Sequence, residues 1–153
     1  MEFRLLGPVE VLGDDGVPVA VPGKRPRAVL ALLLLHPNQA LSTERLIDAV
    51  WGDDPPPSAR GALQVHVHAL RKALGVDRIV TRAPGYLMRV EPGELDVARF
   101  DELARDGRHA EALALWRGPA LADVADQAFA RADAARLEEA RLTALEGRIA
   151  ADV

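Results

Sequence analysis

The chain has 153 residues, 49% of them hydrophobic, which is enough for one ordinary domain or two small ones. It contains no cysteine, so disulfides, thiolate zinc sites and cysteine catalysis are excluded, and we expect a cytoplasmic location. No apolar run approaches the roughly 18–20 residues of a membrane span, so we expect no membrane partner.

Charge is distributed unevenly along the chain, whose formal net charge is −4. Residues 58–89 carry six cations and a single acid, Asp77. From Glu94 to the end there are eight cations and 13 acids, a net charge of −5. Because a basic segment attracts phosphate and an acidic one repels it, we expect any nucleic-acid partner to bind the first segment.

The N-terminal part predicts two strands and a helix. The run FRLLGPVEVL is rich in residues that favour strands, and the turn residues at 13–16 are expected to bring it back onto VPVAV as an antiparallel pair. The alanine- and leucine-rich run RAVLALLLLH, bounded by Pro26 and Pro37, predicts the first helix.

Two further helices follow, separated by a rigid spacer. Ser42 or Thr43 is expected to cap the helix ERLIDAVW, and Gly52 to end it. No helix can run through the three prolines of DDPPPS. The third helix is therefore expected over residues 59–74, with Gly75 ending it.

A hairpin comes next. Residues 78–82 and 86–90 have strand character, and Ala83-Pro84-Gly85 has turn composition, which places Arg82 at the hairpin tip. After Pro92-Gly93 the sequence is helical throughout. LDVARFDELARDG and RHAEALALWRG predict two helices joined by a tight turn, and a long helical segment begins near Asp126.

This order predicts an α+β winged helix-turn-helix, with N-terminal strands, three helices and a C-terminal hairpin wing, followed by an all-α helical-repeat segment. We expect the winged-helix domain to cover residues 1–92. The helical domain is expected to cover residues 93–153.

The third predicted helix has an acid-free polar face. Its core stripe is formed by residues at helical spacing: Leu63, Val67, Leu70 and Leu74. The other arc carries Arg60, Gln64, Val65, His68, Arg71 and Lys72. Arginine pairs with guanine, glutamine pairs with adenine, and a branched methyl contacts the thymine methyl. We predict that this helix reads the major groove and that Arg82 enters a narrow A·T-rich minor groove; the simpler alternative is a solvated basic face.

Other chemistries have little support. His66 and His68 point to nearly opposite sides of a helix, so no metal site is predicted, and His66 is expected to be a hydrogen-bonded histidine at the edge of the core. GVPVAVPGKR departs from the spacing of a phosphate loop. Lys24, Arg25 and Arg27 either meet phosphate or belong to a solvated loop. No catalytic arrangement stands out, so we expect neither an enzyme nor a cofactor.

The segment LIDAVWGDDPPPSARGALQVHVHALRKALG, followed by RIVTRAPGYLMRV, resembles the OmpR-type winged-helix DNA-binding domain. Together with the helical extension that begins LDVARFDELA, it is similar to the Streptomyces antibiotic regulatory protein (SARP) family. The resemblance implies a winged helix followed by a bacterial transcriptional activation domain of TPR-like helical repeats, here in a shortened form.

The resemblance carries DNA contacts to particular positions. It places the recognition-helix contacts at Arg60, Gln64, Val65, His68, Arg71 and Lys72, and the minor-groove contact at Arg82. It assigns the sugar-phosphate backbone contacts to Trp51, Thr81 and Tyr86. Gly61 and Ala69 stand where many OmpR-type helices carry larger polar residues, so we expect sparse direct base readout.

The resemblance also implies a function. Family members activate secondary-metabolite (antibiotic) gene clusters by binding direct repeats near promoters and recruiting RNA polymerase. The expected partners are therefore double-stranded promoter DNA, RNA polymerase holoenzyme and a second copy of the chain on DNA, at the nucleoid. The alternative is a protein-interaction module that uses the winged helix as a docking surface. Salt-dependent DNA binding distinguishes the two.

Overall fold

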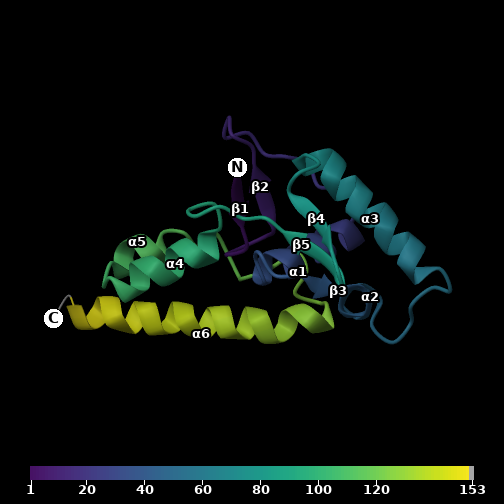
Figure 1. Ribbon diagram of the computed structural model, residues 1–153. Helices are drawn as coiled ribbons and strands as arrows, with labels where there is room; N and C mark the ends of the chain where they lie inside the picture. The colour runs from purple at the N-terminus through teal and green to yellow at the C-terminus, as the bar shows by residue number, and fades with distance from the viewer. Residues whose placement is uncertain (152–153) are drawn as a thin grey trace.

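The computed structural model describes residues 1–151 (Figure 1). Its elements are, in order, β1 (Glu2–Arg4), β2 (Glu10–Leu12), α1 (Lys24–Leu35), β3 (Leu41–Ser42), α2 (Thr43–Trp51), α3 (Ala59–Leu74), β4 (Ile79–Arg82), β5 (Gly85–Met88), α4 (Asp96–Arg105), α5 (His109–Leu113) and α6 (Ala128–Ala151). This order confirms the predicted fold class, a winged helix followed by an all-α segment.

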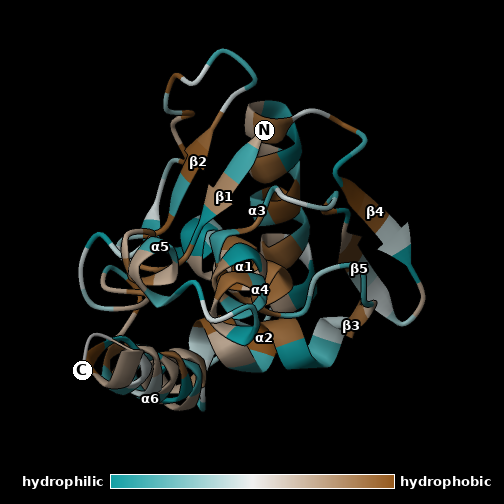
Figure 2. Ribbon diagram, turned by 90° about the vertical axis from the view of Figure 1, so that its left-hand side faces the viewer, coloured by the Kyte–Doolittle hydropathy of each residue, from teal (hydrophilic) through white to brown (hydrophobic). Residues whose placement is uncertain are grey.

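Helix α1 forms the centre of the winged-helix half. Eight of its twelve residues are buried, because its sequence is apolar on nearly every side. It contacts α2, α3, β5 and α6, and Figure 2 shows it in the middle of the view with other elements around it. The helix begins at Lys24, earlier than predicted, because Pro26 lies in the first turn, where a missing N–H is tolerated.

The predicted boundaries of α2 and α3 are confirmed. The Ser42 hydroxyl caps α2 by accepting the Arg45 N–H at 3.1 Å, and Gly52 ends the helix with a positive φ of 61°. Gly75, with φ 99°, ends α3. The buried residues of α3 are the four of the predicted core stripe. A short turn-and-proline spacer thus sets α3 at an angle to α2, as a helix-turn-helix requires.

The wing belongs to a three-stranded antiparallel sheet with the order β3-β5-β4. In the β4–β5 hairpin Thr81 is opposite Tyr86, and Arg82 is opposite Gly85. The predicted hairpin is therefore confirmed. Strand β3, which was not predicted, pairs Leu41 with Tyr86 and joins the wing to the start of α2.

The predicted pairing of the N-terminal strands is confirmed only in part. The main ladder, which was not predicted, joins β1 at the start of the chain to β2 at the end of FRLLGPVEVL, with Phe3 opposite Val11. VPVAV does return antiparallel onto β2, through a bridge to Leu12 and a hydrogen bond from the Val19 N–H to the Val11 carbonyl at 2.8 Å. The chain reverses around Gly7, whose φ of 149° favours glycine. A strand cannot continue through this segment, because its N–H groups bind the helical half instead of another strand.

The helical half contains fewer helical residues than predicted. Helices α4 and α5 form the expected hairpin around Gly107, but α5 has only five residues instead of the eleven of RHAEALALWRG. The chain leaves the helix because the N–H groups of Arg117 and Leu121 bind the carbonyls of Leu6 and Leu5. Among residues 1–151, no helix, including the 24-residue α6, combines the length and apolar character needed to cross a bilayer.

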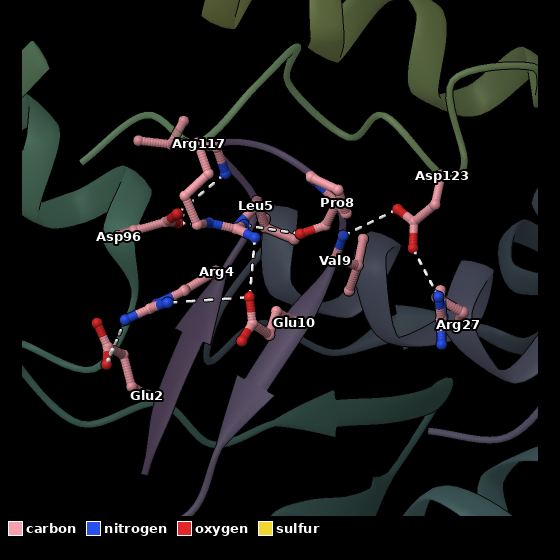
Figure 3. A network of polar contacts seen from close by, with 11 residues as sticks. Glu2, Arg4, Leu5, Pro8, Val9, Glu10, Arg27, Asp96, Arg117 and Asp123 are labelled. Carbon is pink, nitrogen blue, oxygen red and sulfur yellow. Dashed lines mark hydrogen bonds and ion pairs between the residues drawn. The ribbon is translucent and has the colours of Figure 1, made fainter. Parts of the chain in front are cut away.

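One continuous hydrophobic core joins the two halves. A network of polar contacts also joins them (Figure 3). The buried Asp96 carboxylate accepts the N–H groups of Leu5 and Leu6 at 2.9–3.0 Å. Asp123 accepts the N–H of Val9 at 2.8 Å, and Arg117 donates to the Pro8 carbonyl at 2.7 Å. The helical half therefore satisfies backbone N–H groups in the connection between β1 and β2.

Candidate nucleic-acid interface

Helix α3 lies at the edge of the molecule (Figure 1), and the four residues of its core stripe are buried. Five of its six predicted DNA-contacting residues are exposed: Arg60, Gln64, Val65, His68 and Lys72. Val65 is 65% exposed, a high fraction for a valine. The sixth residue, Arg71, is half-buried. The outer face of α3 is thus open, basic and narrow enough to enter a major groove.

The electrostatics of α3 differ between its ends. No acid lies on the helix, and Arg71 and Lys72 occupy its last turn, where cations complement the helix dipole. Near the first turn, Arg60 forms an ion pair with Glu44 of α2. Lys72 has no acidic partner among residues 1–151, so the C-terminal half of α3 is its more positive part.

The wing tip is anchored to α2 and presents Arg82. The backbone N–H and the hydroxyl of Thr43 both donate to the Pro84 carbonyl, at 3.3 and 3.4 Å. Arg82 is exposed at the end of β4, and within the described chain no carboxylate pairs with it. The guanidinium therefore projects from a fixed hairpin with its charge uncompensated.

Gly85 allows the wing to approach α2 this closely. A Cβ at this position would lie 2.0 Å from the Leu41 carbonyl oxygen and 2.8 Å from the Thr43 nitrogen. Both neighbours are backbone atoms, which cannot yield as a flexible side chain does. Glycine is therefore required where the wing turns onto β3.

Arg71 is directed at the wing. Its Nε donates to the Ile79 carbonyl and a terminal nitrogen donates to the Thr81 hydroxyl, both at 2.9 Å. Its guanidinium also lies 5.7 Å from the ring centroid of Tyr86. The structure thus brings together Arg71, Thr81 and Tyr86. Sequence reasoning missed this contact, because helical spacing gives the arc on which a residue lies and not the partner it meets.

Trp51, predicted to contact the DNA backbone, is half-buried at the end of α2. The centroid of its ring lies 5.8 Å from that of the His66 ring and 5.8 Å from the Arg25 guanidinium. Burial, and secondarily the charge of Arg25, lower the pKa of His66 and so favour the neutral form of its ring. His66 is at the core edge, as predicted, but its contact is an aromatic ring, with no hydrogen bond within residues 1–151.

Two of the three cations near the start of α1 pair with the helical half. Lys24 contacts Asp126 at 2.7 Å, and Arg27 contacts Asp123 at 2.8 Å. Both ion pairs therefore join the two halves of the chain. Residues 1–151 hold no group of three or more histidine, aspartate or glutamate side chains placed to bind a metal ion.

Comparisons with known proteins identify both halves. Residues 21–88 match the family described as "Transcriptional regulatory protein, C terminal", which covers α1 to the wing. Residues 95–153 match the "Bacterial transcriptional activator domain". The predicted boundary between residues 92 and 93 falls between these two matches.

Three similar proteins have names or titles that state a role or a bound partner. The chain is 34% identical to the regulatory protein DnrI of Streptomyces peucetius, over all of this chain and 65% of DnrI. It is 35% identical to the transcriptional regulator RedD of Streptomyces coelicolor, over 99% of this chain and 49% of RedD. The solved structure of Mycobacterium tuberculosis EmbR, in complex with a low-affinity phosphopeptide, matches 99% of this chain and 46% of that one, with a TM-score of 0.84 and 31% identity.

The fold, the exposed basic helix and these matches define a winged-helix transcriptional regulator with a bacterial transcriptional activator domain. The chain belongs to the Streptomyces antibiotic regulatory protein family. It spans about two thirds of the length of DnrI and half of that of RedD.

Proposed function

We propose that this chain binds DNA sequence-specifically and activates transcription of a secondary-metabolite gene cluster. The observation that carries the proposal is the pairing of an exposed, acid-free face on α3 with an exposed arginine on an anchored wing. A docking surface for protein needs neither an acid-free helix nor a projecting arginine. Both features suit a polyanion with two grooves.

In this arrangement α3 lies in the major groove and the wing reaches the adjacent minor groove. Gln64 and Val65 are placed for base edges, the first for adenine and the second for a thymine methyl. Lys72 and His68 lie further round the exposed face, and Arg60 is available once it leaves Glu44. Arg82 enters the minor groove, while Trp51, Thr81 and Tyr86 contact the sugar-phosphate backbone.

The helical half serves a protein partner and not DNA. Its net charge of −5 from Glu94 onward repels phosphate. We place RNA polymerase, or a second copy of the chain on a neighbouring repeat, against this acidic half. Direct repeats near promoters suit such a protein, because two copies bound head to tail present the same face in the same direction.

The proposal is tested by selecting duplexes with the full chain from a random DNA pool. Enrichment of a direct repeat, bound at least about a thousandfold more tightly than random duplex, is the expected result. Transcription in vitro from a promoter that carries the selected repeat then tests activation. Equal affinity for selected and random duplexes contradicts sequence-specific binding and favours the protein-docking alternative.

A further inference from the structure

We propose that Arg71 is a positioning residue that fixes the wing against the recognition helix and thereby sets the minor-groove contact of Arg82. This inference rests on the proposed function, since it takes DNA as the ligand. It differs from the sequence-based expectation, in which Arg71 reads a base in the major groove. The structure places its guanidinium on β4, away from the open face of α3.

Arg71 contacts both the backbone and the side chains of the wing. The bond to the Ile79 carbonyl fixes the backbone of β4, and the bond to the Thr81 hydroxyl fixes a side chain one residue before Arg82. The ring of Tyr86, directly opposite Thr81 in the hairpin, lies 5.7 Å from the guanidinium. Among residues 1–151, the two hydrogen bonds of Arg71 are the only ones that a side chain of α3 makes with the wing.

A base contact by Arg71 would require these interactions to be broken. The Arg71 side chain is half-buried, while Gln64, Val65, His68 and Lys72 on the same helix are exposed. The planar guanidinium already donates hydrogen bonds to a carbonyl and a hydroxyl and lies near an aromatic ring, so it is pre-organised for its present position. The open face of α3 therefore reads bases without it.

The place of this contact also suits the path of DNA. A strand of sugar-phosphate backbone separates the major groove, entered by α3, from the minor groove, entered by the wing. Arg71 and Thr81 lie at the junction of these two elements. In the proposed arrangement they therefore face that strand. Because the Thr81 hydroxyl accepts from Arg71, its own proton remains available to a phosphate oxygen.

The wing has anchors at its tip and its base, and Arg71 supplies the middle one. Thr43 holds the tip through the Pro84 carbonyl, and Arg78 holds the base through a two-bond contact with Glu94 at 2.6 and 2.7 Å. Neither anchor comes from α3. Loss of the Arg71 contacts should thus leave a folded wing whose position relative to α3 is less well defined.

The test measures two affinity ratios for each variant on the duplex selected by the full chain. The first compares inosine·cytosine with guanine·cytosine pairs under the wing, which differ only by the guanine amino group in the minor groove. The second compares the selected and a changed base pair under α3, and so reports major-groove reading. The variants are Arg71→Met and Arg71→Lys, with Lys72→Met as a matched control on the same helix turn.

For the wild-type chain we expect a wing ratio of about fivefold or more. Arg71→Met should bring the wing ratio to about one and leave the α3 ratio unchanged. Adding Arg82→Ala to Arg71→Met should lower the wing ratio no further. Arg71→Lys, whose single nitrogen cannot make both bonds, should give an intermediate ratio. Lys72→Met should lower affinity and flatten the salt slope while preserving both ratios.

Two results overturn the positioning role. The first is a lost α3 ratio with an intact wing ratio in Arg71→Met, which identifies a base contact. The second is that both ratios persist in Arg71→Met and Arg71→Lys. Circular dichroism and thermal unfolding of each variant show whether it is folded. If the wild-type chain shows no sequence preference at all, the proposed function itself is contradicted. This result is distinct from the two that overturn only the role of Arg71.

Discussion

The carboxylate of Asp96 accepts the backbone N–H of Leu5 with both oxygens, at 2.9 and 3.0 Å, across 91 positions of the sequence. One of those oxygens also accepts the N–H of Leu6 at 2.9 Å. Asp96 is only 2% exposed, so the winged-helix half has its backbone satisfied by a buried charge from the other half. Burial, opposed by these hydrogen bonds, raises the pKa of Asp96.

Asp96→Asn should lower the free energy of unfolding by about 1–3 kcal/mol, because the amide NH2 faces N–H donors and leaves at least one of them unsatisfied. Denaturant unfolding of the full chain measures this change. Asp106→Asn, at the exposed end of α4, is the matched control and should change stability by less than about 0.5 kcal/mol. Equal effects of the two substitutions would show that the Asp96 contacts add nothing to stability.

Glu94 should make the protein sensitive to acid. The hydrogen bonds from Arg78 hold the pKa of Glu94 below its ordinary value of 4.5. Since the folded-state pKa is lower than the unfolded one, this contribution to stability is fully present above about pH 4.5 and is lost as the pH falls through the folded-state value.

Glu94→Gln should therefore reduce stability most near neutral pH, and the difference from wild type should shrink below pH 4.5. Thermal unfolding from pH 3 to pH 7 measures this dependence. Glu91→Gln, an exposed neighbour with no ion pair within residues 1–151, serves as the control. A difference between Glu94→Gln and wild type that is constant over the whole range would contradict the linkage.

Local sequence features predicted the helix-turn-helix and the wing well. The Ser42 cap, the stops at Gly52 and Gly75 and the core stripe of α3 depend on residues close to one another in the chain. Errors occurred where distant residues decide the structure. Strand β1 ends early because Asp96 takes the N–H groups that follow it, and α5 ends early because Arg117 pairs with Leu6.

In the candidate site, too, contacts between residues distant in the sequence could not be predicted. The exposed face of α3 followed from helical periodicity, and the exposure of Arg82 from turn composition. The direction of Arg71 depended on the placement of Thr81, which no spacing within α3 reveals. The pairing of Lys24 with Asp126 likewise required knowledge of where the helical half lies.

Gln64 should contribute sequence discrimination. Gln64→Ala is expected to weaken binding to the selected duplex by about 1–3 kcal/mol and to leave binding to random duplex nearly unchanged. The reason is that an uncharged amide on the exposed face of α3 can read a base edge but attracts phosphate only weakly. Fluorescence anisotropy on both duplexes measures the two affinities. Equal losses on both would reduce Gln64 to a backbone contact.

Arg82 should carry the preference for A·T pairs under the wing. Arg82→Ala is expected to lower affinity and to abolish that preference, because a narrow minor groove concentrates negative potential around an inserted guanidinium. Arg82→Lys should restore the affinity only in part, since an ammonium is more strongly hydrated. Competition with A·T-rich and G·C-rich duplexes measures the preference. Full activity of the lysine variant would show that charge alone suffices.

The central claim is that α3 and the wing bind the phosphate-bearing grooves of DNA, and the salt dependence of affinity tests it most directly. Log affinity of the full chain for the selected duplex should fall linearly with log salt, and Lys72→Met and Arg82→Ala should each flatten the slope by about one unit. Lys24→Met, which removes a cation already paired with Asp126, should leave the slope unchanged. A slope near zero, or one that Lys24→Met flattens as much as the other two substitutions do, would contradict the claim.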